Sequence, residues 1–312
     1  MVEGEKSDPA AVTSGVPQGT VLGPILFLAF INDLPCHAKH STVRLFADDC
    51  VLQMEINSPH DCAKLQEDVD SIAEWERRWL MEFNAAKCEV MSIQANRSPT
   101  LHDYYLHGHI LNRTNATKYL GVTISSDLKW NSHIANITAK ANRTLGLLRR
   151  NLQVGDVKTK EKAYFSLVRP QVEYASNVWD PYTTSLKSKI EMVQRRSARY
   201  ATRRYHNTSS VASMLDTLKW DTLENRREQA RLTMFYKVVH NMVALPKEDF
   251  LIQSNRPSRH GSHISFLHIP ARTDYFKNSF FPRTVPQWNR LDSAITSAET
   301  LTQFKCSLSK LY

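Results

Sequence analysis

The segment Val43-Arg-Leu-Phe-Ala-Asp-Asp-Cys-Val-Leu52 places two adjacent carboxylates between two apolar runs. β-prone residues on both sides and an Asp pair between them are typical of two strands joined by a tight turn. The sequence therefore predicts a hairpin over residues 43–54 with Asp48 and Asp49 at its tip. Neighbouring carboxylates repel one another unless a cation lies between them, so the pair indicates a divalent-metal site. A solvated loop is the alternative, but the apolar strands on both sides favour a turn that is held rigidly.

A glycine-containing segment lies about thirty residues upstream. Ser14-Gly-Val-Pro-Gln-Gly-Thr-Val-Leu-Gly-Pro24 leads into a helix that apolar spacing predicts over residues 22–34. Gly15 and Gly19 permit a ligand to approach the backbone closely, and the start of a helix favours an anion. An ordinary loop-to-helix joint is the alternative. The segment is not a P-loop, because no Gly-Lys-Ser/Thr follows it.

The remaining chain changes character along its length. Ser58 is a suitable N-cap and Pro59 a suitable first residue for a long amphipathic helix, and short β-prone runs follow it. After about residue 130 the pattern is nearly all helical. The fold class that these patterns predict is α+β: a mixed or antiparallel sheet with packed helices over residues 1–128, an α-helical region over 129–245, and a proline-rich, loop-rich extension over 246–312.

The charge is divided unevenly between the two ends of the chain. The 312 residues carry a net charge of +9, with −6 on residues 1–132 and +15 on residues 133–312. The densest basic run, residues 187–204, holds seven Lys and Arg and a single acid. An unbalanced basic region is typical of a protein that binds nucleic acid or another polyanion, and a solvated helix face is the alternative.

Several classes of protein are excluded or disfavoured. The longest apolar stretch, residues 21–31, is shorter than the roughly 20 residues that span a bilayer, and no signal peptide is visible. We therefore expect no membrane span and no secretion, with an intracellular location in the nucleus, the cytoplasm or both. The five cysteines are scattered and form no CxxC pair, which argues against a disulfide scaffold or a zinc finger. HExxH and GxSxG motifs are also absent.

Two of these segments together resemble a known family. Ser14-Gly-Val-Pro-Gln-Gly19 followed by Phe46-Ala-Asp-Asp49 is similar to the palm signature of reverse transcriptases, most closely those of non-LTR (LINE-type) retrotransposons. Further strings match in the same order along the chain: Trp79-Leu-Met-Glu-Phe-Asn84, Lys87-Cys88, Tyr119-Leu-Gly-Val122, Leu167-Val-Arg-Pro170, Glu173-Tyr174, Trp179, Val193-Gln-Arg-Arg196, Phe281-Pro-Arg283 and Trp288-Asn289. The resemblance implies the C-terminal half of an RNA-directed DNA polymerase, with a partial palm (1–128), a helical thumb (129–245) and a C-terminal extension (246–312).

The resemblance also implies roles for individual residues. Asp48 and Asp49 bind the catalytic Mg²⁺ or Mn²⁺, and Lys87 lies near the leaving pyrophosphate. Residues beside the template and the incoming nucleotide are Ser14, Gly15, Pro17, Gln18, Gly19, Phe46 and Ala47. Tyr119, Leu120, Gly121 and Val122 hold the primer end, and Arg195, Arg196 and Arg199 contact the nucleic-acid backbone. Core packing and helix solubility are equal alternatives for these last two groups. The implied partners are an RNA template, a DNA primer and deoxynucleoside triphosphates.

One part of the family's catalytic site is not found in the sequence. In this family a third metal-binding aspartate comes from a strand well upstream of the glycine loop, and only thirteen residues precede Ser14. We therefore expect that the chain alone exposes a sheet edge and apolar surface, is poorly soluble and is inactive. An upstream polymerase segment that supplies the missing strand is then an expected partner. A non-catalytic RNA- or DNA-binding thumb module and a decayed retroelement relic are the alternatives.

Overall fold

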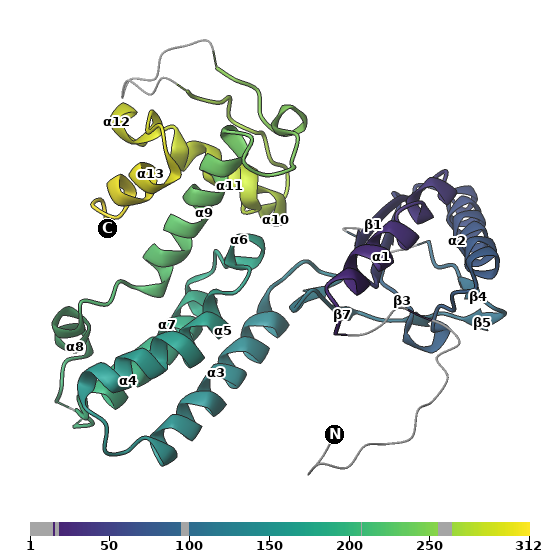
Figure 1. Cartoon of the computed structure of the whole chain (residues 1–312). Coiled ribbons are helices and arrows are strands. Elements are labelled where there is room, and N and C mark those ends of the chain that lie inside the picture. The colour runs from purple at the N-terminus through teal and green to yellow at the C-terminus, as the bar shows by residue number, and fades with distance from the viewer. Residues whose placement is uncertain (1–14, 16–18, 95–99, 207, 255–263) are drawn as a thin grey trace. The chain divides into compact units, whose positions relative to one another are not determined.

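The structure is a computed structural model that describes residues 15, 19–94, 100–206, 208–254 and 264–312. The chain divides into two compact units, Met1–Asn115 and Ala116–Tyr312, each of which is described by itself (Figure 1). The elements of the first unit are α1 (Leu22–Ile31), the 3₁₀ turn η1 (Leu34–His37), β1 (Thr42–Phe46), β2 (Asp49–Gln53), α2 (Pro59–Trp79), the 3₁₀ turn η2 (Ala85–Lys87), β3 (Glu89–Val90), β4 (Tyr105–Leu106), β5 (His109–Ile110) and β6 (Asn112–Arg113).

The predicted hairpin is confirmed as the antiparallel pair β1–β2. Val43 pairs with Leu52 and Leu45 pairs with Cys50, and all four side chains face the same apolar cluster. This alternation follows from the two-residue period of a strand, which directs every second side chain to one face. Helices α1 and α2 supply further members of the cluster, among them the buried Trp75, and Leu34 of η1, Met81 and Phe83 complete it. The hairpin is therefore held from one side by two helices.

Helix α2 begins at the residue that the sequence predicts. Ser58 and Asp61 form a capping box, in which the Asp61 carboxylate accepts a hydrogen bond of 2.9 Å from the Ser58 backbone N–H. Reciprocal bonds of this kind satisfy amide groups that the first helical turn leaves free. Farther along α2, the indole Nε1 of Trp75 donates to Asp33 at 2.8 Å and ties α2 to η1.

A buried carboxylate fixes the approach to β1. The Oδ1 atom of Asp68 accepts a hydrogen bond from the backbone N–H of Lys39 at 2.8 Å, and Oδ2 accepts from His40 at 3.0 Å and from Ser41 at 2.6 Å. Burial opposes ionisation of Asp68, but the hydrogen bonds from residues 39–41 outweigh burial and lower the pKa of the carboxyl group. A helix side chain therefore positions the strand that leads to the Asp pair.

We expect Asp68→Asn to destabilise the first unit by about 2–4 kcal/mol at neutral pH, because charged hydrogen bonds to three amides are weakened. The pKa of Asp68 is lowered on folding, so its stabilisation is present above the unfolded value of about 3.9 and is lost as the pH falls below it. Urea unfolding at several pH values measures the free energy of unfolding. The difference in this free energy between wild type and variant should become smaller in acid. Asp70→Asn, on the exposed side of the same helix, is the control, and equal losses in the two variants contradict the assignment.

The described residues confirm the α+β class, but their strands do not form the one mixed or antiparallel sheet that the sequence predicts. The strands instead form four separate two-stranded sheets, of which only β3–β6 is parallel. Hairpin β1–β2 accordingly has no neighbouring strand in the described part of the chain. Helix α1 is apolar on every side, and its outer residues Leu22, Ile25, Leu26 and Leu28 are each more than half exposed. An apolar surface of this kind is typical of a face that another segment covers.

The second unit is mostly helical and begins with a hairpin. Its elements are β7 (Ala116–Tyr119), β8 (Val122–Ser125), α3 (Asn131–Asn151), α4 (Val157–Ala163), the π-helical turn η3 (Tyr164–Val168), α5 (Arg169–Glu173), α6 (Ser176–Trp179), α7 (Thr184–Thr202), α8 (Val211–Leu218), α9 (Leu223–Val239), the 3₁₀ turn η4 (Lys247–Asp249), α10 (Asp274–Lys277), α11 (Phe280–Trp288), α12 (Ser293–Thr296) and α13 (Leu301–Leu308). The mostly helical structure that the sequence predicts after residue 130 is thus confirmed.

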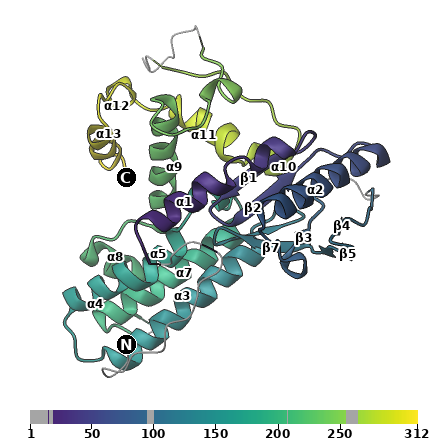
Figure 2. The same ribbon diagram turned by 45° about the vertical axis from the view of Figure 1, so that its right-hand side comes forward.

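Helices α3, α4 and α7 lie side by side around the first of two cores in this unit (Figures 1 and 2). Val122 of β8 belongs to this core, together with Trp179 and Val193. The backbone N–H of Thr123 donates to Nδ1 of the buried His133 at 3.1 Å, and burial lowers the pKa of this histidine. Hairpin β7–β8 therefore packs with the helices, and the boundary between the two units falls before β7.

The sequence predicts a loop-rich C-terminal extension. Residues 274–308 of this extension nevertheless contain the short helices α10–α13. Pro286 lies inside α11, in a helix of nine residues. Trp288 and Phe304 share the second core with Phe235 of α9. The prolines limit the length of these helices without preventing them, because the aromatic side chains bury enough surface to hold short segments in place. Helix α9 therefore contributes side chains to both cores of the second unit.

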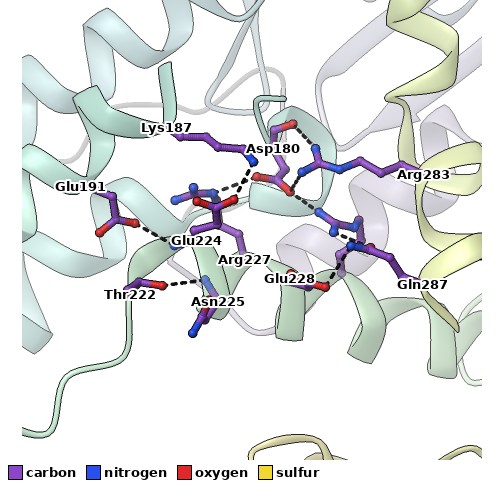
Figure 3. Close-up of polar contacts among 11 residues, drawn as sticks. Asp180, Lys187, Glu191, Thr222, Glu224, Asn225, Arg227, Glu228, Arg283 and Gln287 are labelled. Atoms are coloured by element: carbon purple, nitrogen blue, oxygen red, sulfur yellow. Dashed lines mark hydrogen bonds and ion pairs between the residues drawn. The ribbon is translucent and has the colours of Figure 1, made fainter. Parts of the chain in front are cut away.

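A buried cluster of charged side chains connects the residue after α6 with helices α9 and α11 (Figure 3). Asp180, just after α6, accepts hydrogen bonds from Arg227 at 2.9 Å and from Arg231, both on α9. Arg283 of α11 lies 3.2 Å from the same carboxylate and donates to the Asp180 carbonyl at 2.9 Å. One carboxylate thus holds three guanidinium groups from two helices that lie far apart in the sequence.

Candidate functional site

The Asp pair lies at the tip of hairpin β1–β2. Phe46 pairs with Asp49 across a two-residue turn formed by Ala47 and Asp48. Asp49 is therefore the first residue of β2, and only Asp48 is a central turn residue. Ala47 has a φ of 51°, in the left-handed region that favours glycine. Backbone strain of this kind persists where the surrounding structure enforces it, here through a hairpin packed on two helices.

Both carboxylates are free to take a ligand. Asp48 and Asp49 are exposed, and neither side chain has an ion pair or a hydrogen bond within the described residues. Phe46 beside them is 62% exposed. Carboxylate oxygens are the ligands that Mg²⁺ takes in proteins, so the pair suits a divalent cation. In the part of the chain that the structure describes, no third Asp, Glu, His or Cys joins them.

The segment that leads to Lys87 packs through Phe83 on the same apolar cluster as Cys50 and Leu52 of strand β2. Burial raises the pKa of the Cys50 thiol to about 11, and the nearby Cys88 contributes to this increase. Cys50 directly follows the Asp pair and Cys88 directly follows Lys87. Both candidate catalytic segments are thus attached to one apolar cluster. Lys87 is exposed and forms no ion pair with a described residue.

A buried glutamate positions this second segment. Glu76 of α2 accepts a hydrogen bond from the backbone N–H of Phe83 at 2.6 Å, and its other oxygen lies 2.9 Å from Nε2 of His107. Burial raises the pKa of the Cys88 thiol, and the charge of Glu76 raises it further. Glu76 thus connects α2 to the chain on both sides of Lys87.

The upstream glycine segment is described only in part. Gly15 and Gly19 have φ values of 87° and 77°, and no atom of a described residue is found within 4 Å of the position that a Cβ would take at either glycine. Open space beside two left-handed glycines agrees with their expected role as points of close approach. Ser14, Pro17 and Gln18 lie outside the described residues. Thr20 accepts a hydrogen bond from the Gly23 backbone at 3.0 Å at the start of α1.

The expected primer-grip residues form the turn of hairpin β7–β8. Tyr119 pairs with Val122, and the φ values of Leu120 and Gly121 are 45° and 83°. Two left-handed residues are typical of a type I′ turn. The hydroxyl of Tyr174 donates to the Leu120 carbonyl at 3.0 Å. The Tyr174 ring therefore lies against this turn.

We expect Gly121→Ala to destabilise the second unit by about 1–3 kcal/mol, because the new Cβ meets both an unfavourable φ and the Tyr174 ring. A Cβ at residue 121 lies 3.0 Å from Cε1 of Tyr174. Gly108→Ala is a matched control, since Gly108 has a φ of 73° with nothing within 4 Å. Denaturant unfolding compares the two variants. If Gly108→Ala costs as much as Gly121→Ala, the contact with Tyr174 is unimportant.

The three arginines expected at the nucleic-acid backbone lie on α7. Arg195 and Arg196 are exposed and Arg199 is half-buried, while Val193 and Ala198 face the core. Arg196 donates to Asn142 of α3 at 3.1 Å. None of the three has an ion pair in the described part of the chain. Their charges are therefore available to a polyanion.

One known protein family matches the N-terminal part of this chain. The family described as "Reverse transcriptase (RNA-dependent DNA polymerase)" matches the region that contains the glycine segment, the Asp pair, Lys87 and the Tyr119 turn. Residues 1–124 match the reverse transcriptase family. The expected resemblance is thus confirmed for this region. The assignment of the chain to the C-terminal half of a polymerase, and of its parts to palm and thumb, remains a prediction.

Similar curated proteins come from mobile elements of Drosophila melanogaster. The "RNA-directed DNA polymerase from mobile element jockey" is 32% identical over 212 residues, which cover 64% of this chain and 23% of that protein. The "Probable RNA-directed DNA polymerase from transposon BS" is 31% identical over 216 residues, 64% of this chain and 24% of that protein. The chain thus spans about a quarter of these relatives. No solved structure matches it.

The search for membrane-spanning segments gives a negative result for the described residues. No helix among them combines the length and the apolar character that crossing a bilayer requires. Helix α1 is the most apolar, but it has only ten residues. The expected nuclear or cytoplasmic location remains a prediction.

Proposed function

We propose that this chain is a segment of an RNA-directed DNA polymerase of a mobile element, in which Asp48 and Asp49 hold the divalent ions of nucleotidyl transfer. The observation that carries the proposal is the exposed carboxylate pair, without a partner among the described residues, on a packed hairpin inside the region that matches the reverse transcriptase family. Asp48 and Asp49 would hold a divalent ion there, which would neutralise the negative charge of a bound triphosphate.

The residues around the pair support distinct tasks. Asp48 and Asp49 bind the cation, and Lys87 supplies a positive charge for the leaving pyrophosphate. Gly15 and Gly19 leave room for the nucleotide or the templating base. The turn Tyr119–Val122 and the arginines of α7 contact the primer and the nucleic-acid backbone, and RNA, DNA and deoxynucleoside triphosphates are the substrates.

The proposed reaction requires more ligands than the described residues supply. Two-metal transfer places two ions about 3.5–4 Å apart, and two carboxylates leave many of their coordination positions to water and substrate. The exposed outer face of α1 and the unpaired edges of hairpin β1–β2 are suited to a further polymerase segment. We therefore propose that such a segment completes the site and that this chain alone does not extend a primer.

A fluorescent deoxynucleoside triphosphate tests the proposal directly. We expect it to bind the wild-type chain in Mg²⁺ and to bind at least about tenfold more weakly in EDTA, because the cation joins the triphosphate to the carboxylates. Lys87→Ala should weaken binding without removing its dependence on Mg²⁺. Nucleotide binding of equal strength in Mg²⁺ and in EDTA contradicts the proposal.

A non-catalytic nucleic-acid-binding module is the second candidate, and the basic second unit with its unpaired α7 arginines favours it. A module of this kind binds an RNA–DNA hybrid equally well in Mg²⁺ and in EDTA and does not retain the nucleotide. The nucleotide assay therefore separates the two candidates, while binding of the hybrid alone does not.

A further inference from the structure

A cleft of about 490 Å³ lies in the second unit, away from the hairpins and from the arginines of α7. Helix α9 supplies one wall and α13 another, and Asn177 of α6 contributes at one end. The volume is within the range of about 300–1,000 Å³ that is common for ligand sites. None of the sequence motifs described above assigns a role to it.

The cleft is basic and contains no acid among its lining residues. Lys237 of α9 and Lys305 of α13 line it, and neither has an ion pair or a side-chain hydrogen bond in the described part of the chain. Arg226 lines it as well, with Nε and Nη2 committed to Glu173. Two ammonium groups on separate helices thus face a shared space without a counter-charge, which favours an anionic ligand.

The lining residues of α9 form a straight stripe. Arg226, Gln229, Thr233 and Lys237 follow one another at intervals of three or four residues, which places them on one face of the helix. The eleven steps from Arg226 to Lys237, at 1.5 Å each, give the stripe a length of about 16 Å. That length suits several consecutive phosphates of a strand better than a single phosphate.

Two buried polar atoms in the lining lack hydrogen bonds. Oδ1 of Asn177 is an acceptor and Nε2 of Gln229 is a donor, and neither has a partner within the described residues. Buried groups of this kind are usually satisfied by protein, water or ligand. A ribose-phosphate backbone offers both complements, a sugar hydroxyl as donor and a phosphate oxygen as acceptor. No aromatic side chain lines the cleft, so bases have no platform on which to stack.

We propose that this cleft binds the sugar-phosphate backbone of single-stranded RNA without regard to sequence. The proposal goes beyond the proposed nucleotidyl transfer, since it concerns the other unit and requires no metal. Lys237 and Lys305 contact phosphates, Gln229 donates to a phosphate oxygen, and Asn177 accepts from a ribose hydroxyl. The C-terminal extension thereby gains a role in holding RNA through α13.

Fluorescence anisotropy of the full chain with a labelled twelve-residue oligouridine in EDTA tests the proposal. We expect the double variant Lys237→Ala/Lys305→Ala to bind about tenfold more weakly, with a salt dependence of log K that is shallower by about 0.7 for each lost contact. The matched control is Lys158→Ala/Lys277→Ala, which removes two exposed lysines outside the cleft. Because EDTA removes metal binding, failure here does not bear on Asp48.

Each outcome of this experiment either supports or overturns the proposed RNA binding by the cleft. Equal losses in the two double variants show that net charge alone attracts RNA, and they overturn the proposal. Displacement of the oligouridine by millimolar uridine monophosphate indicates a mononucleotide site and also overturns it. Oligothymidine that binds as tightly as oligouridine contradicts the role of Asn177. Lys237→Arg/Lys305→Arg should retain binding, which shows that loss in the alanine variant follows from charge and not from misfolding.

Discussion

Replacing Asp180 by asparagine is expected to lower the free energy of unfolding of the second unit by about 3–5 kcal/mol, because it leaves buried guanidinium groups without a counter-charge. The side chains of Arg227 and Arg231 are 0% and 2% exposed, and that of Asp180 is 8% exposed. For a unit of this size the loss corresponds to a fall in Tm of roughly 10 °C. Guanidinium chloride unfolding, followed by tryptophan fluorescence, measures the change.

Asp216→Asn is the matched control for this experiment. Asp216 lies on the exposed side of α8 in the same unit, and its side chain has no ion pair within the described residues. The control should therefore change stability by no more than about 0.5 kcal/mol. If Asp180→Asn and Asp216→Asn unfold at the same denaturant concentration, Asp180 does not hold α6, α9 and α11 together.

The second large effect concerns metal binding at the hairpin tip. We expect Asp48→Asn/Asp49→Asn to lose the strongest Mn²⁺ site of the chain, with an affinity lower by about tenfold or more, because amides replace both charged ligands. Electron paramagnetic resonance measures this by the signal of free Mn²⁺ during a titration. Both side chains are exposed, so the substitution should leave the fold intact.

A second pair of adjacent acids in the same chain supplies the control. Glu248 and Asp249 are exposed and belong to the short turn η4. Their double variant, Glu248→Gln/Asp249→Asn, removes the same charge and should leave the strongest Mn²⁺ site unchanged. If the two double variants lose Mn²⁺ equally, the hairpin offers only general negative charge, and the proposed metal centre is wrong.

Local chemistry allowed much of the fold to be predicted from the sequence. The hairpin at the Asp pair and the start of α2 at Ser58 depend on short-range patterns, and both are confirmed. The α+β class is confirmed as well, but the division of the strands into separate two-stranded sheets was not predicted, because strand pairing depends on partners that local patterns do not identify. Helices α10, α11 and α12 of the C-terminal extension were not predicted, since Pro286 inside α11 suggests a break that the surrounding aromatic core prevents.

The residues of the candidate site remain a prediction, and the residues that support them could not be predicted from the sequence. Asp48, Asp49 and Lys87 were found through short motifs, whereas Glu76 and Asp68, which position their segments, lie on α2 among other acids and carry no distinguishing pattern. Asp180 follows Trp179, and Arg283 ends a quoted string, yet nothing in the sequence indicates that they meet. Contacts between residues so far apart emerge only from the packing of α9 with α11.

Anomalous diffraction from crystals of the chain grown with Mn²⁺ and a deoxynucleoside triphosphate tests the central claim most directly. The account predicts a manganese peak in contact with a carboxylate oxygen of Asp48, beside the phosphates of the nucleotide. Manganese bound only elsewhere, with the Asp48 and Asp49 side chains surrounded by water alone, contradicts it.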